Sequence, residues 1–91
     1  MNQVSHNAAA SRYEIEVEGK LAVCAYERGG GAQVFTHTLV PPELRGRGLA
    51  EVLVRTALDD AKAAGRKVVP QCSYVAKFIE RHAEYQPLLA K

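Results

Sequence analysis

The chain has 91 residues, a length that makes one small domain with room for a single site. Its 12 basic and 10 acidic residues leave a formal net charge of +2, which is too balanced for a protein that binds nucleic acid through bulk electrostatics. The hydrophobic fraction of 47% predicts a soluble globule, and no apolar run approaches the ~20 residues of a membrane span, so we expect no membrane partner.

Residues 1–11 are polar and alanine-containing, with neither a stable periodicity nor the layout of a secretory signal. We expect a disordered tail here and a single domain over residues 12–91. The two cysteines, Cys24 and Cys72, lack the spacing of a zinc site or a disulfide framework. We therefore expect no metal and a cytoplasmic location, where thiols stay reduced.

Three strands are predicted before residue 41. From Arg12 onward the sequence alternates, with apolar residues at 13, 15 and 17 and acidic residues at 14, 16 and 18, as in a half-buried strand. After a turn at Glu18-Gly19-Lys20, residues 21–26 are apolar on both faces and predict a central strand. The glycines at 29–31 return the chain into a third strand over residues 33–40, which makes the three strands antiparallel.

Two residues in these strands could carry chemistry. Cys24 could be a nucleophile or a redox thiol, but a small thiol inside an apolar strand usually serves packing alone. His37 shares a predicted face with Phe35 and Leu39 and is either a hydrogen-bonded structural residue or a catalytic base. Its strand leads into the next loop, so a ligand held by that loop would pass close to His37.

The third strand leads into the loop Arg45-Gly46-Arg47-Gly48-Leu49-Ala50, which opens a helix. Its glycines allow a tight bend and a close approach of backbone N–H groups, and the first turn of a helix has amides without acceptors. With two arginines, this arrangement predicts a site for phosphate or pyrophosphate. The alternatives are an ordinary strand-to-helix turn and, disfavoured by the charge balance, a nucleic-acid contact through Arg45, Arg47 and Arg66.

The remaining elements follow from periodicity. An apolar stripe predicts a helix over residues 49–64 that faces the sheet and ends at Gly65. Residues 67–70 then predict a buried parallel strand after a right-handed crossover, and residues 74–84 predict a second helix with Ser73 as its N-cap. The stripe of the first helix consists of Leu49, Val52, Leu53, Ala57, Ala61 and Ala64.

Cys72 would then lie immediately before the second helix. The aligned peptide dipoles at a helix N-terminus favour a thiolate, the attacking form of cysteine, so Cys72 is the better nucleophile candidate. Alternatively, it packs under the helix as a small apolar group.

Together these elements predict a small α/β (α+β) fold. It has three antiparallel strands, a crossover helix, a parallel strand and a C-terminal helix, arranged as one mixed sheet with helices covering it.

The segment 40–50, with sequence VPPELRGRGLA, resembles the signature Gln/Arg-x-x-Gly-x-Gly/Ala of the GNAT superfamily of acyl-CoA-dependent N-acyltransferases. Arg45, Gly48 and Ala50 occupy the three fixed places. His37-Thr38 and the segment 70–74 also resemble minimal, stand-alone GNAT-like proteins, and the likeness covers residues 13–89.

The resemblance implies an acetyl-CoA-dependent N-acetyltransferase whose acceptor is an unidentified amine, in a small molecule or a protein lysine. It implies that coenzyme A lies between the strands at 33–40 and 67–70, with Cys72 near its thioester. His37 is the candidate base because of its place on the strand that leads into the loop. The residues expected to bind coenzyme A are Val40, Arg45, Gly46, Arg47, Gly48, Leu49 and Ala50.

The chain also departs from larger members of the superfamily. Its length leaves no room for the additional N-terminal helices and C-terminal strands that usually build the acceptor pocket. The general-acid tyrosine of many members could correspond to Tyr74 or Tyr85. A CoA-binding or interaction module without turnover is therefore the alternative function.

Overall fold

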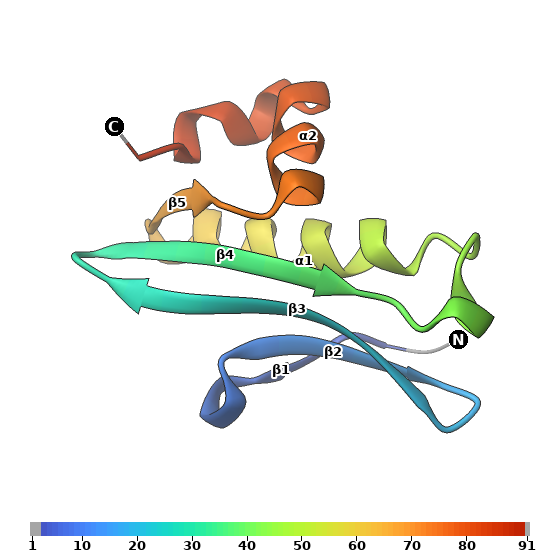
Figure 1. The fold of residues 1–91 in the computed structure, drawn as a ribbon. Helices are drawn as coiled ribbons and strands as arrows, with labels where there is room; N and C mark the ends of the chain where they lie inside the picture. Colours follow the sequence, from blue (N-terminus) through green and yellow to red (C-terminus); the bar gives the residue numbers. More distant parts are fainter. Residues whose placement is uncertain (1–2, 91) are drawn as a thin grey trace.

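The structure is a computed structural model that describes residues 3–90. Its strands form one sheet in the order β1-β2-β3-β4-β5, and every neighbouring pair is antiparallel except β4 and β5, which are parallel (Figure 1). The predicted fold class, a mixed sheet with a crossover helix, is confirmed. The elements in chain order are β1 (Ser5–Asn7), η1 (Ala8–Ala10), β2 (Arg12–Val17), β3 (Lys20–Gly29), β4 (Ala32–Leu39), η2 (Pro42–Leu44), α1 (Leu49–Ala64), β5 (Lys67–Pro70), α2 (Ser73–Arg81) and η3 (Ala83–Leu88), where η marks a 3₁₀ helix.

The first strand lies where the sequence predicts a disordered tail. Ser5–Asn7 pairs with β2, and the ring of His6 stacks on Tyr13 with centroids 4.2 Å apart. The Nε2 atom of His6 also lies 2.6 Å from the hydroxyl oxygen of Tyr26. A strand of three polar residues is too short to show a period in the sequence. Residues 1–2 of the predicted tail lie outside the described residues.

A β-bulge interrupts β4. Ala25 pairs with His37 and the next residue of β3, Tyr26, pairs with Phe35, so Thr36 is the extra residue on β4. Because of this bulge, Phe35 is fully buried while His37 is exposed. The prediction that these two side chains share a face is wrong.

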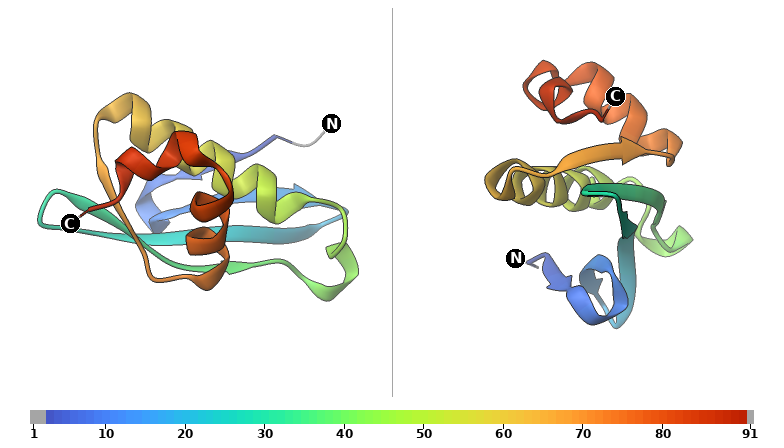
Figure 2. Two further views of the ribbon diagram at one scale, coloured as in Figure 1. Left: turned by 90° about the horizontal axis from the view of Figure 1, so that it is seen from above. Right: turned by 90° about the vertical axis from the view of Figure 1, so that its left-hand side faces the viewer.

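Helix α1 packs on β2 and β3, whereas α2 packs beside β4 and β5 and also contacts α1 (Figure 2). Two hydrogen bonds tie α1 to its neighbours: Tyr13 donates to Asp60 at 2.8 Å, and Tyr85 of η3 donates to Asp59 at 2.6 Å. The predicted bounds of α1 are confirmed, but its stripe differs, since Val52 is 44% exposed. The buried residues of α1 are Leu53, Val54, Ala57, Leu58 and Ala61.

None of the helices within residues 3–90 is long and apolar enough to cross a membrane.

Candidate functional site

The central feature of the site is the divergence of β4 from β5. Their parallel pairing ends at Phe35 and Pro70, and one further bond joins the amide of Cys72 to the carbonyl of Phe35 at 2.9 Å. Beyond this point β4 continues to Leu39 beside β3, while the other chain segment turns into α2 (Figure 1). The bulge at Thr36 lies where the strands part. We call the region in which the two segments diverge the splay. An extended ligand can pair with the edge of β4 that is turned toward it.

One end of the splay leads to the glycine loop. Gly46 and Gly48 have φ values of +84° and +75°, which side chains with a Cβ rarely adopt. Gly48 is the N-cap of α1 and has no side chain to accept from the first amides of the helix, so those N–H groups remain available to an anion. The loop therefore has the backbone geometry that the sequence predicts for a pyrophosphate site.

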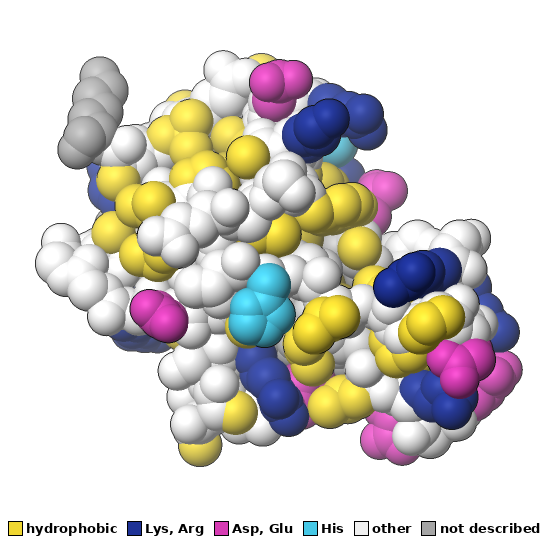
Figure 3. All heavy atoms as spheres, viewed as in Figure 1, with side chains coloured by type: hydrophobic (Ala, Val, Ile, Leu, Met, Phe, Trp, Pro, Cys, Tyr) yellow, Lys and Arg dark blue, Asp and Glu magenta, His cyan; other side chains and the backbone are white. Residues whose placement is uncertain are grey.

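A pocket of about 250 Å³ lies at this loop. It contains six of the seven residues expected to bind coenzyme A, and it adds Leu44, the first-turn residue Glu51 and Tyr74 from α2. Figure 3, viewed as in Figure 1, shows Lys and Arg side chains mixed with Asp and Glu at the loop end of the molecule. The expected residues that line the pocket are Val40, Arg45, Gly46, Gly48, Leu49 and Ala50.

The two arginines of the loop have different partners. Arg45 lines the pocket, and its Nε donates to the carbonyl of Val40 at 3.2 Å, so its charge is not paired there with an acid. Arg47 instead forms an ion pair with Glu18 of the β2–β3 turn at 3.3 Å and does not line the pocket. Arg45 is therefore better placed than Arg47 to meet a phosphate.

The structure brings Cys24 and Cys72 to one hydroxyl at the other end of the splay. The Oγ1 atom of Thr38 lies 3.5 Å from the Sγ atom of Cys72 and 3.8 Å from that of Cys24. Cys24 is fully buried, and this burial raises the pKa of its thiol to about 11. Cys72 is half-buried and is itself the N-cap of α2, the position that the sequence assigned to Ser73. Cys72 is thus the accessible thiol.

Thr38 was not singled out as a site residue from the sequence. A regular strand has no residue that shifts its alternation, so the sequence does not show that Thr38 lies on the same face as Phe35 and Cys24; the bulge at Thr36 places it there. His37 precedes it but has an exposed side chain, whose Nδ1 lies 3.3 Å from the hydroxyl of Thr36. The structure therefore groups Thr38 with Cys72 and gives no hydrogen bond between His37 and either of them among the described residues.

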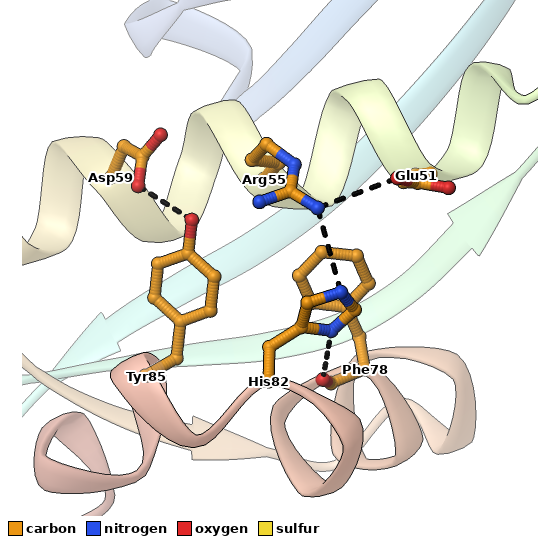
Figure 4. Close-up of polar contacts among 6 residues, drawn as sticks. All are labelled: Glu51, Arg55, Asp59, Phe78, His82 and Tyr85. Atoms are coloured by element: carbon orange, nitrogen blue, oxygen red, sulfur yellow. Dashed lines mark hydrogen bonds and ion pairs between the residues drawn. The ribbon is translucent and has the colours of Figure 1, made fainter.

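The two candidate tyrosines are separated by the structure. Tyr85 is 2% exposed and its hydroxyl donates to Asp59 of α1 (Figure 4), so it anchors η3. Tyr74 is 40% exposed and lines the loop pocket, and partial burial raises its pKa. Only Tyr74 borders the site.

The two thiols should differ in their reaction with iodoacetamide. At neutral pH we expect the folded protein to be alkylated once, on Cys72, because Cys24 is buried and its raised pKa keeps it protonated. Mass spectrometry of the intact protein and of its peptides would measure this. A second alkylation should require denaturant, and Cys72→Ala should stay unmodified when folded. Equal labelling of both thiols in the folded protein would contradict this placement.

The loop and the splay lie within the part of the chain that is similar to known proteins. Residues 12–88 match the family described as GCN5-related N-acetyl-transferase. The chain is 32% identical to Protein NATD1 of Gallus gallus over 83 residues, which cover 88% of this chain and 76% of that protein. It is 32% identical to Protein NATD1 of Danio rerio over 88 residues, which cover 91% and 80%, and 31% identical to Protein NATD1 of Homo sapiens over 83 residues, which cover 88% and 74%.

Proposed function

Because this chain belongs to the GCN5-related N-acetyltransferase family, we propose that it binds acetyl-CoA between β4 and β5 and transfers the acetyl group to an amine. The observation that carries the proposal is the position of the splay: it has a glycine loop with uncapped helix amides at one end and an accessible thiol at the other. A ligand with a pyrophosphate, an extended amide-containing arm and a thioester matches these features in that order.

The backbone performs most of the binding. The amides of the loop and the first turn of α1 donate to the pyrophosphate, and the Arg45 guanidinium adds a positive charge. The edge of β4 after the bulge holds the amides of the pantetheine arm as a neighbouring strand would. This arrangement orients the thioester toward Thr38 and Cys72.

Two routes of transfer are compatible with these residues. In the covalent route the Cys72 thiolate attacks the thioester carbonyl, an S–acetyl bond forms on Cys72 and the CoA thiolate leaves. The amine then attacks the acetyl-cysteine, the thiolate of Cys72 leaves again, and the amine proton passes to water. In the direct route the amine attacks the thioester itself, the CoA thiolate leaves, and His37 or a water accepts the amine proton.

The covalent route is favoured by three features of Cys72. Its thiol is half-buried, the hydroxyl of Thr38 lies 3.5 Å away, and the amides of the first turn of α2 follow it directly. Those amides can stabilise a thiolate and the oxyanion that develops during attack. His37 has no comparable contact with the thiol, so its role as a base belongs to the direct route.

A CoA-binding module without turnover is the second candidate, because the pocket at the glycine loop is lined by none of the three residues named for the transfer step, His37, Thr38 and Cys72. A nucleic-acid contact is disfavoured because Arg47 is paired with Glu18 and the net charge is +2.

Calorimetric titration with CoA should give one site of measurable affinity. Acetyl transfer to a panel of amines, including polyamines and lysine peptides, should then release CoA, detected with a thiol reagent. Binding without transfer to any amine would favour the module, a salt-sensitive gel shift with RNA or DNA would favour the nucleic-acid contact, and no binding of CoA would overturn the proposal.

A further inference from the structure

A second hollow, of about 230 Å³, adjoins the loop pocket. Glu51 and Tyr74 line both spaces, so a ligand held at the loop can continue directly into this hollow. The other residues that line it are Lys77, Phe78 and Arg81 of α2 and His82, which follows the helix.

The hollow carries two positive charges without partners. Lys77 and Arg81 lie four residues apart on α2, both are exposed, and neither forms an ion pair with any residue that the structure describes. Like charges at this spacing on a helix repel each other. A bound anion between them would remove this repulsion. In Figure 3, Lys and Arg side chains lie beside a histidine over α2.

The acidic residue of the hollow is already neutralised. Arg55 of α1 lies 3.4 Å from the carboxylate of Glu51 and 3.4 Å from Nε2 of His82 (Figure 4). Nδ1 of His82 lies 2.8 Å from the carbonyl oxygen of Phe78. Because a carbonyl oxygen can only accept a hydrogen bond, Nδ1 carries the ring proton and donates it, which leaves Nε2 as the atom that accepts from Arg55. Glu51, Arg55 and His82 thus satisfy one another, and the charges of Lys77 and Arg81 remain for a ligand.

Aromatic rings form the floor of the hollow. The rings of Tyr74 and Phe78 have centroids 6.5 Å apart, and those of Phe78 and His82 stack with centroids 4.1 Å apart. The guanidinium of Arg55 lies over Phe78, 5.3 Å from its centroid, and holds that ring in place. Tyr74 is 40% exposed, so its ring is available for stacking against the nucleobase of a ligand. Free cations beside an exposed ring suit a phosphorylated nucleoside better than an inorganic anion.

We infer that Lys77 and Arg81 bind the 3′-phosphate of coenzyme A, with the purine against Tyr74. The inference rests on the proposed function, because it requires the pyrophosphate to lie at the glycine loop. A single ribose separates the pyrophosphate from the 3′-phosphate, so the adjoining hollow is within reach. The 3′-phosphate carries a charge of about −1.5 to −2 at neutral pH, enough to engage both cations. This chain therefore distinguishes coenzyme A from dephospho-CoA, which lacks that group.

Calorimetric titration of the full chain with both ligands at low ionic strength tests this subsite. The wild type should bind dephospho-CoA about tenfold more weakly than CoA, the effect of losing hydrogen bonds to charged groups. In the double variant Lys77→Gln/Arg81→Gln the two affinities should converge, because CoA binding falls while dephospho-CoA binding stays unchanged. Lys62→Gln, which removes an exposed charge from the far end of α1, is the control and should keep the tenfold preference.

Three other outcomes of this titration would contradict the subsite, the residues assigned to it or the proposed function. Equal affinities for the two ligands in the wild type would overturn the subsite and leave the proposed function intact. A preference for CoA that persists in the double variant would overturn the assignment to Lys77 and Arg81. Failure of both ligands to bind the wild type would instead contradict the proposed function, on which the subsite depends.

Discussion

Replacing Gly48 by glutamate is expected to weaken CoA binding by a factor of about 100 or more, as a like charge placed against a bound anion costs several kcal/mol. Gly48 adopts φ +75° at the N-cap of α1 and lines the loop pocket. A glutamate there strains the loop and brings a carboxylate to the amides that should receive the pyrophosphate. Calorimetric titration with CoA measures the change.

The matched control for this variant is Gly31→Glu. Gly31 has φ +81° in the β3–β4 turn and, as at Gly48, a Cβ added to it would meet no atom within 4 Å. Both substitutions therefore introduce the same charge and a similar backbone strain of about 1 kcal/mol. Only Gly48→Glu should lose CoA binding, with both variants keeping a cooperative unfolding transition. Equal affinities of the two variants would show that the loop does not receive the pyrophosphate.

Replacing Cys72 by alanine is expected to lower the turnover number by about 100-fold or more if Cys72 is the nucleophile, because no other group can form the acetyl intermediate. CoA binding should change little, since the thiol lies at the opposite end of the splay from the loop pocket. The rate of CoA release with an active amine measures the first effect, and calorimetry measures the second.

A direct readout of the intermediate accompanies this variant. Wild-type protein incubated with acetyl-CoA and no amine should gain one acetyl group on Cys72, and an amine should then remove it. Full activity of Cys72→Ala would eliminate the covalent route. In that case His37→Ala becomes the informative variant, and its full activity would exclude His37 as the base of the direct route.

The sequence predicted the features whose causes are local. Helix α1 begins and ends as expected because Gly48 and Gly65 adopt left-handed conformations at its two ends. The parallel strand β5 also follows from a short apolar run after a crossover helix. Five of the six residues of the glycine loop line one pocket, because residues of a tight turn lie close together in the sequence and in space.

Features that depend on tertiary packing were not predictable in the same way. The bulge at Thr36 reverses the orientation of His37 and turns Thr38 toward the two thiols, yet nothing in residues 33–40 marks its position. Arg47 was expected to support the loop, but Glu18 of a distant turn is its partner. Val52 was assigned to the buried stripe of α1, whereas Leu58 takes part in the core instead.

The backbone amide NMR spectrum of the protein, recorded during titration with CoA, tests the central claim most directly. We predict that the largest shifts will fall on Gly46, Gly48 and Ala50, with further shifts along β4 after the bulge and at Cys72. These positions trace the pyrophosphate site, the splay and the thiol in one experiment. A spectrum that does not change, or shifts confined to β1 and β2, would contradict the claim that this chain holds coenzyme A between β4 and β5.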